Sequence, residues 1–333
     1  MTLQSPENKN DFQRIGDWIF EKASILILAH QRPDGDAIGS LVGLFYSLRD
    51  NGVVCNAYIK EDVPERYQDL IPKGLLVGAE VDFSHYDALI CLDTANEKRL
   101  AIPNNLTFND LALPICNLDH HVDNSRYGKI FCIKSSCAAT AELVVQLIQN
   151  LSLKITSKPA TMLLMGIITD TGGFRFNNTT ADTLKTAAWL IENGGDYNLI
   201  MRKVYFEEPA NKLKLTGKLC EKIKFAFGNR VAYFFLTSEL LSSYKVDEKD
   251  TEDLVDIARA IKGVEIACRI QKVKGGVRFS LRSKNEAFSV NDIAHELGGG
   301  GHRMAAGAFV NNIDLEKGEE LFLNCAKKIF YDK

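Results

Sequence analysis

The first half of the chain alternates short apolar segments, rich in β-branched residues, with stretches in which apolar residues recur at helical spacing. The segments expected to form strands are residues 24–30, 53–59, 87–93, 114–119 and 128–133. Helical spacing is present over 37–50 and over 138–151, which follows Ser135 and Ser136 as possible N-caps. This alternation predicts an α/β fold with a parallel sheet and helices on both faces.

The second half follows a different pattern. From about 158 to 227 the sequence is mainly helical; strands are expected over 230–237, 263–271 and 275–283, and a helix over 251–262. A chain of 333 residues has room for two domains with separate cores. We therefore expect three parts: a parallel-sheet domain over 1–195, a helical linker over 196–228, and a smaller mixed-sheet α/β domain over 229–333.

Composition excludes several classes of protein. The chain is 46% hydrophobic and 25% charged with a net charge of −3, which is typical of a soluble globular protein and not of a polycation that holds long nucleic acid. Its eight cysteines form no C-x-x-C pair, so we expect buried, reduced thiols. The polar N-terminus does not resemble a signal peptide, and no apolar stretch approaches the ~20 residues of a membrane span. A cytoplasmic location is the expectation.

Polar side chains collect where apolar segments end. The first group, "HQRPDGD", begins at the last residue of 24–30, and the second is the final residue of "DALICLD". The third group comes directly after "PICNL" and the fourth directly after "MLLMGIIT". The side chains at these ends are His30, Asp34, Asp36, Asp93, Asp119, His120, His121 and Asp170. The carboxyl ends of parallel strands share one edge of a sheet, where open α/β folds bind their ligands. We therefore expect one cluster.

Such a cluster of carboxylates would repel itself unless cations neutralise it, and two divalent metals are the simplest solution. Carboxylate and imidazole ligands without thiolate suit Mn²⁺ or Mg²⁺, although zinc and cobalt also fit this ligand type. Two such ions about 3.5–4 Å apart can clamp a phosphoryl group and generate hydroxide from water. The reaction this predicts is phosphoester hydrolysis.

Each of these residues also has a purely structural interpretation. Asp36 could cap the helix that starts near Ala37, and Asp34 could bond its own backbone in a turn. Asp93 could begin the next turn, and Asp170 could close a helix. We favour a site because independent caps need not include so many potential metal ligands.

A second motif, "ELGGGGHRMAAGAFV" at 296–310, contains four consecutive glycines whose amides could form an anion nest. It lacks the Lys-Ser/Thr of a P-loop, and a flexible turn is the structural alternative. Basic residues precede it, and alternation along a strand places Arg278, Ser280 and Arg282 on one face. Arg282 and Arg303 are the preferred phosphate ligands, because a guanidinium can grip a phosphate with two parallel bonds.

Together these motifs resemble a known family. "AHQRPDGDAIGS", "CLDTAN", "NLDHHVDN" and "GIITDTGGFRF" resemble the motifs of the DHH phosphoesterase family, and "GGGGHRMAAGA" resembles the glycine-rich motif of its DHHA1 C-terminal domain. They occur in the expected order and cover nearly the whole chain. The resemblance implies a DHH domain, a helical linker and a DHHA1 substrate-binding domain.

The resemblance also implies roles for individual residues. One Mn²⁺ would be held by His30, Asp34 and Asp93, and a second by Asp36, Asp93, His120 and Asp170. Mg²⁺ or Co²⁺ could replace Mn²⁺. Asp93 would bridge the two ions, Asp119 would orient a ligand, and His121 would touch the substrate phosphate or assist proton transfer. Residues that would bind the phosphate from the other domain, across a cleft, are Gly299, Gly300, Gly301, His302, Arg282 and Arg303.

Within the family, the chain resembles the compact nanoRNase/pAp-phosphatase type. This implies removal of nucleotides from very short oligoribonucleotides, and of the 3′-phosphate of adenosine 3′,5′-bisphosphate (pAp). Neither a membrane nor long nucleic acid is expected as a partner, and a homodimer is a further expectation. Alternatives are a phosphodiesterase for dinucleotide signals (pApA, pGpG or c-di-AMP), a nucleotide-binding regulator without activity, and a tRNA-related editing role.

Overall fold

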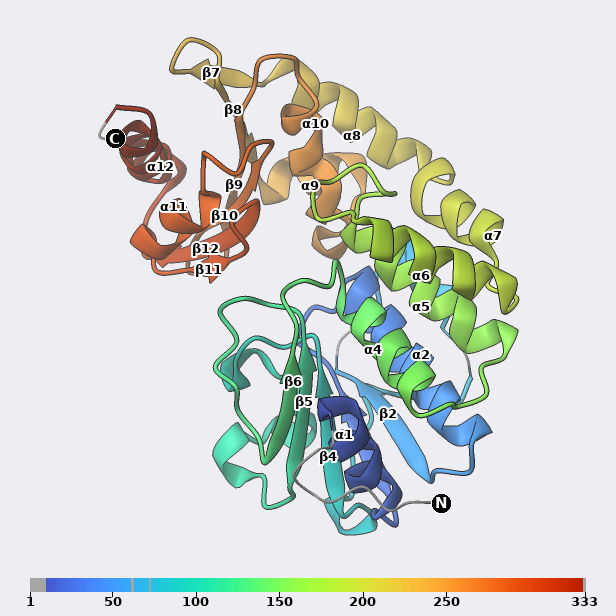
Figure 1. Ribbon diagram of the computed structural model, residues 1–333. Coiled ribbons are helices and arrows are strands. Elements are labelled where there is room, and N and C mark those ends of the chain that lie inside the picture. The colour runs from blue at the N-terminus through green and yellow to red at the C-terminus, as the bar shows by residue number, and fades with distance from the viewer. Residues whose placement is uncertain (1–9, 61–62, 72, 332–333) are drawn as a thin grey trace. The chain divides into compact units, whose positions relative to one another are not determined.

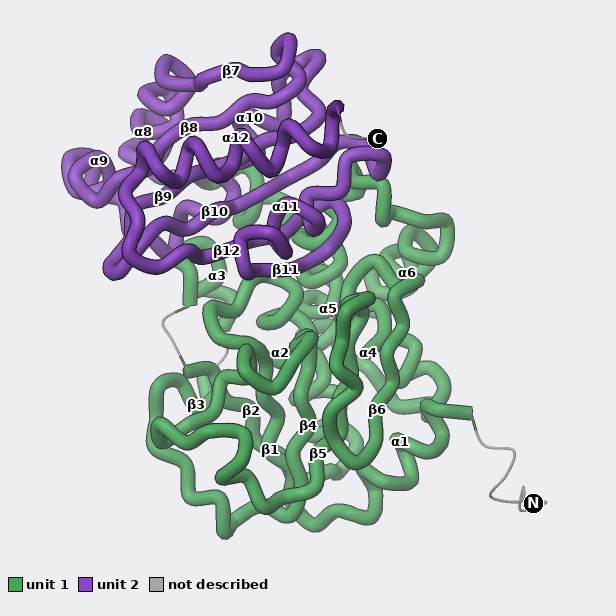
Figure 2. Tube along the Cα trace, turned by 90° about the vertical axis from the view of Figure 1, so that its left-hand side faces the viewer, with its two compact units in different colours: residues 1–207 green, residues 208–333 purple. Residues whose placement is uncertain are grey.

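The computed structural model describes residues 10–60, 63–71 and 73–331. The chain divides into two compact units, Met1–Glu207 and Glu208–Lys333 (Figure 2). The first nine residues, which include the start of the polar N-terminus, lie outside the described part. Within that part, no helix has the length and apolar character needed to cross a membrane.

A six-stranded sheet forms the centre of the first unit (Figure 1). Its strands are β1 (Ile25–Leu28), β2 (Cys55–Ile59), β3 (Leu76–Val77), β4 (Ala88–Leu92), β5 (Ile115–Asp119) and β6 (Ile130–Ile133). All pairings are parallel, in the order β3-β2-β1-β4-β5-β6. The predicted parallel α/β sheet is therefore confirmed, and only the two-residue strand β3 was not expected.

Successive residues of β1 pack into two different cores. Ile25 and Ile27 belong to the core shared with the α-helices, whereas Leu26 and Leu28 pack on the opposite face. The helices are α1 (Asp11–Phe20), α2 (Gly35–Asp50), α3 (Glu65–Gln68), α4 (Thr140–Asn150), α5 (Ser157–Asp170), α6 (Ala181–Glu192), α7 (Tyr197–Met201) and a π-helical turn (Arg202–Phe206). Short 3₁₀ helices between residues 83 and 110 contribute to the opposite face.

The helix starts differ from the sequence-based expectation. The N-cap of α2 is Asp34, whose Oδ1 accepts from the amides of Asp36 and Ala37; Asp36 itself lies in the first turn. Helix α4 begins at Thr140 with Ala139 at its N-cap, which excludes Ser135 and Ser136 as caps. Since Ala139 has no side-chain acceptor, the first amides of α4 need a partner from elsewhere.

A second six-stranded sheet, of mixed type, forms the other unit in the order β11-β12-β10-β9-β8-β7. The strands are β7 (Lys224–Ala226), β8 (Val231–Leu236), β9 (Ile266–Val273), β10 (Gly276–Ser283), β11 (Gly300–Gly301) and β12 (Ala305–Asn311). The helices are α8 (Ala210–Glu221), α9 (Ser238–Tyr244), α10 (Val255–Arg259), α11 (Val290–Glu296) and α12 (Leu315–Tyr331). Only β8 and β9 pair in parallel.

The helix predicted over 251–262 is shorter than expected. Only Val255–Arg259 is α-helical, after a 3₁₀ turn at Glu252–Leu254. The carbonyl of Thr251, just before this turn, accepts a hydrogen bond from the guanidinium of Arg269, a buried residue of the sheet. All eight cysteines are free, as expected, but Cys220 is exposed.

Candidate active site

His30 and Asp93 lie where the strand order of the first sheet reverses. His30 follows β1 and Asp93 follows β4, the neighbouring strands whose connections run in opposite directions across the sheet. This switch point is where open α/β sheets bind ligands. Asp93 has a positive φ of 52°, which costs about 1 kcal/mol for a non-glycine residue. The strained turn places its carboxylate at the carboxyl edge of the sheet.

The two oxygens of the Asp93 carboxylate face different histidines. Asp93 Oδ2 lies 3.5 Å from His30 Nε2, and Asp93 Oδ1 lies 3.7 Å from His120 Nε2. The Asp93 residue is only 2% exposed. Burial opposes ionisation, but the three neighbouring histidines outweigh it and hold the pKa of Asp93 well below its usual range. A carboxylate with this orientation is suited to bridging two cations.

Backbone carbonyls orient both of these histidines. His30 Nδ1 is 2.7 Å from the carbonyl of Gln31, and His120 Nδ1 is 3.4 Å from the carbonyl of Cys137. A carbonyl can only accept, so each bonded Nδ1 carries the proton. Each Nε2 faces the carboxylates and is the atom that would bind a metal, an orientation common among metal-binding histidines.

Asp36 supplies the missing cap of helix α4. Its Oδ2 accepts from the Thr140 amide (2.6 Å), and its Oδ1 accepts from the Ala141 amide (2.9 Å) and the Ser40 hydroxyl (3.0 Å). Burial and the charges of Asp93 and Asp170 nevertheless raise the pKa of Asp36 well above its ordinary value. The helix end alone therefore does not balance the negative charge gathered here.

The Asp170 carboxylate lies at a helix end that disfavours negative charge. It is the last residue of α5, where the helix dipole is negative, and its Oδ2 lies 3.5 Å from His120 Nε2. Two of the groups that could hold a metal ion are His30 with Asp34 and Asp93, and Asp36 with His120 and Asp170. Within each group, one ligand atom from each residue lies within 4.8 Å of the other two. Their mixed oxygen and nitrogen donors and their excess negative charge fit divalent cations.

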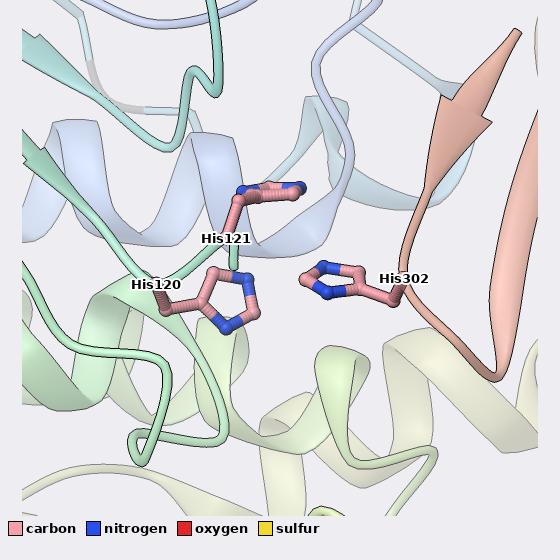
Figure 3. Close-up of side chains that lie close together, drawn as sticks. All are labelled: His120, His121 and His302. Atoms are coloured by element: carbon pink, nitrogen blue, oxygen red, sulfur yellow. The ribbon is translucent and has the colours of Figure 1, made fainter. Parts of the chain in front are cut away.

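Asp119 and His121 form a separate pair beside the carboxylates. His121 Nδ1 is 2.7 Å from Asp119 Oδ1, and the His120 and His121 ring centroids are 4.8 Å apart (Figure 3). Burial lowers the pKa of His121, but its bond to Asp119 and the charges of Asp119 and Asp93 raise it to about 9. His121 therefore carries a proton near neutral pH in the metal-free protein.

Two residues that the sequence reasoning missed complete the site. The hydroxyl of the buried Thr140 donates to Asp93 Oδ1 across 3.0 Å. The Asn124 side-chain amide donates to Asp119 Oδ2 (2.6 Å) and to Asn117 Oδ1 (2.9 Å). Asn124 stands in the motif "NLDHHVDN", so its position was visible, but nothing local in the sequence marks Thr140.

The residues predicted to bind phosphate in the second unit lie on or beside strands β10 and β11 of its sheet. Arg282 lies on β10 and donates to the carbonyl of Leu281, and Arg303 donates to the carbonyl of Glu286 (2.5 Å) from a turn between β11 and β12. The glycines Gly299, Gly300 and Gly301 lie on or beside β11, and His302 follows them. Burial and the nearby charges of Arg282 and Arg278 lower the pKa of Arg269 to about 10.

Known proteins share this architecture. Residues 24–167 match the DHH family, N-terminal domain, and residues 228–331 match the DHHA1 domain. The chain belongs to the DHH family, with a C-terminal DHHA1 domain, as the sequence motifs predicted.

The chain is also similar to individual proteins of known name. The chain is 34% identical over 309 residues to the bifunctional oligoribonuclease and PAP phosphatase NrnA of Thermus thermophilus, covering 91% of this chain and 89% of that protein. It is 28% identical over 300 residues to the NrnA of Bacillus subtilis, covering 87% and 90%. An exopolyphosphatase-related protein from Bacteroides fragilis has the same fold, with a TM-score of 0.84, 25% identity and 98% of both chains covered.

Proposed function

We propose that this protein is a metal-dependent phosphoester hydrolase that degrades very short oligoribonucleotides to mononucleotides and removes the 3′-phosphate of pAp. The observation that carries this proposal is the Asp93 carboxylate, whose two oxygens face His30 and His120 in two adjoining donor sets. The names of the NrnA relatives support the choice of substrates.

Two Mn²⁺ ions fit the donor sets, with Mg²⁺ or Co²⁺ as substitutes. His30, Asp34 and Asp93 would hold one ion, and the ligands of the other would be Asp36, Asp93, His120 and Asp170. When bound, such ions neutralise the carboxylates and lower the pKa of a bound water towards neutrality.

The protein's own groups orient the substrate and move protons. Asp119 Oδ1 accepts a hydrogen bond from His121 Nδ1 and so fixes the orientation of the ring. With a pKa of about 9 before any cation binds, His121 is a cation suited to a phosphate oxygen, or a proton donor to the leaving oxygen. Residues assigned to phosphate binding in the DHHA1 domain are Arg282, Gly299, Gly300, Gly301, His302 and Arg303.

Incubation with Mn²⁺ and a panel of labelled substrates tests this function. The panel contains pAp, a dinucleotide, a trinucleotide and a long RNA. We expect mononucleotide product from the short oligonucleotides, phosphate from pAp and little turnover of the long RNA. Asp93→Ala should abolish all of these activities. Absence of product from the wild type, or an Asp93→Ala variant as active as the wild type, would overturn the proposal.

The same assay distinguishes the other candidate functions. Turnover of pApA, pGpG or c-di-AMP far above that of pAp would instead indicate hydrolysis of dinucleotide signals. A regulator without activity would bind nucleotides tightly but would bind no Mn²⁺ in calorimetry.

A further inference from the structure

On one face of the C-terminal sheet, strands β10 and β12 carry partly buried polar side chains and one exposed aromatic ring. Residues paired directly across two antiparallel strands project to the same side. In the register of β10 and β12, Arg278 pairs with Phe309, Ser280 with Gly307, and Arg282 with Ala305. We call these six residues the open face. Phe309 is 41% exposed there, although large aromatic side chains are usually buried.

The reverse side of the same strands is an ordinary core. Val277, Phe279 and Leu281 alternate with the arginines of β10 and are fully buried in a cluster with residues of α11 and α12. Phe309 therefore has no part in that core. Beside it, Gly307 leaves the surface flat: a Cβ atom there would meet only the carbonyl of Phe279, at 3.4 Å.

The two ends of the open face differ in chemistry. At one end, Arg282 pairs with Ala305, which closes a turn with His302 after the glycines of β11. At the other end, Arg278 is bound by Glu248 across 2.5 Å, which compensates its charge and fixes it in place. The first end therefore suits a phosphate, whereas the Phe309 end suits an uncharged aromatic group.

The spacing of these ends can be obtained from the strand. Arg282 and Arg278 are four residues apart on β10, or about 13 Å at about 3.3 Å per residue. That is several times the 3.4 Å rise per nucleotide of a stacked strand. A strand with one phosphate at Arg282 therefore has room to place the base of a further nucleotide at Phe309.

We propose that Phe309 stacks on a base of a short oligonucleotide and that the open face is a subsite for a nucleotide beyond the hydrolysed phosphate. Exposed aromatic rings on sheet surfaces bind single-stranded nucleic acid in this way without reading its sequence. The inference rests on the proposed function and adds that oligonucleotides and pAp depend differently on this surface, because pAp has no second base to stack.

Steady-state kinetics on a trinucleotide and on pAp test the subsite. The measured quantity is the KM for the trinucleotide divided by the KM for pAp. In Phe309→Ala we expect this ratio to rise about 5- to 100-fold, the effect of losing one stacked base. Phe309→Tyr should keep the wild-type ratio because the ring is retained. Anisotropy of a fluorescent trinucleotide, without added metal, should show a matching loss of affinity in Phe309→Ala only.

Phe225 provides the matched control. It is 47% exposed on β7, at the far edge of the same sheet, so Phe225→Ala should leave the ratio unchanged. A ratio in Phe309→Ala within about twofold of the wild type would overturn the subsite while leaving the proposed function intact. A wild type that cleaves neither substrate would overturn the proposed function, and the inference with it.

Discussion

Thr140 donates its hydroxyl hydrogen bond to Asp93 across 3.0 Å, from the first residue of a helix to the end of a strand 47 residues earlier. The amide of the same residue bonds Asp36. One buried threonine thus restrains two proposed metal ligands. Partners of metal ligands commonly contribute ten- to a hundredfold to affinity or activity.

Thr140→Val should therefore weaken Mn²⁺ binding about 10- to 100-fold, because valine keeps the shape but removes the donor. Calorimetric titration with Mn²⁺ measures the affinity directly, and kcat/KM should fall in parallel. Thr140→Ser retains the hydroxyl and should restore both. Thr186→Val, at a half-buried position of α6 where the hydroxyl bonds the carbonyl of Asp182, is the control. Equal Mn²⁺ affinity of Thr140→Val and the wild type would contradict this role.

Asp36→Asn should separate the two metal sites. The amides of Thr140 and Ala141 bond different oxygens of Asp36. An asparagine in the same position replaces one of these oxygens with an NH₂ donor, so one of the two amides would face a donor in place of an acceptor. We expect the metal-free free energy of unfolding to fall by about 1–3 kcal/mol, measured by denaturant titration. One of two Mn²⁺ equivalents should be lost in calorimetry. Loss of both sites to the same extent would contradict the assignment, and the exposed Asp182→Asn is the control.

Asn124→Asp should reduce kcat more than it raises KM. The substitution places a carboxylate against Asp119 Oδ2 in place of a donor at 2.6 Å, which disturbs the partner of His121. A reduction of about 10- to 100-fold is expected, as for other groups that support a catalytic histidine. Asn104→Ala removes a purely structural asparagine, which bonds Val81, and should lower stability with kcat unchanged. If both variants affect only stability, Asn124 has no positioning role.

Mn²⁺ binding should weaken as the pH falls. Burial lowers the pKa of His30, but its bonds to Asp34 and Asp93 outweigh burial and raise that pKa well above the ordinary value. The metal-free imidazole therefore stays protonated to higher pH, and an ion must displace that proton. Calorimetry at about pH 6 and about pH 8, in buffers of different ionisation enthalpy, should show tighter binding at the higher pH and release of protons. The same affinity at both values would refute the competition.

Gly166→Ala should distort the site through packing alone. A Cβ atom at Gly166 would lie 2.6 Å from Ala141 Cβ and 2.8 Å from Asp36 Oδ1, where three helices meet. Overpacking of this kind costs about 1–3 kcal/mol, so thermal unfolding should shift downwards and Mn²⁺ affinity should fall. Gly217→Ala, in a helix with open space around it, should instead stabilise the protein by about 1 kcal/mol. An unchanged melting temperature in Gly166→Ala would show that the helices can separate.

Local patterns in the sequence determined the parallel sheet, five of its six strands and the residues at their ends. Strand alternation, turn residues and the grouping of carboxylates with imidazoles depend on neighbours in the chain, so they can be read without a structure. Even the helix preceding Asp170 and its terminal turn followed from local spacing. The choice of cap did not: Asp34 and Asp36 are both good N-cap residues, and their order alone does not decide between them.

Only the tertiary structure decided what each polar group does. Asp36 caps a helix that begins 104 residues later, and Thr140 reaches Asp93 across 47 residues. The start of the helix predicted over 251–262 likewise involves a distant residue, because Arg269 on strand β9 donates a hydrogen bond to the carbonyl of Thr251. Hydrogen bonds of this kind depend on which elements the sheet brings together, and no local pattern encodes that packing.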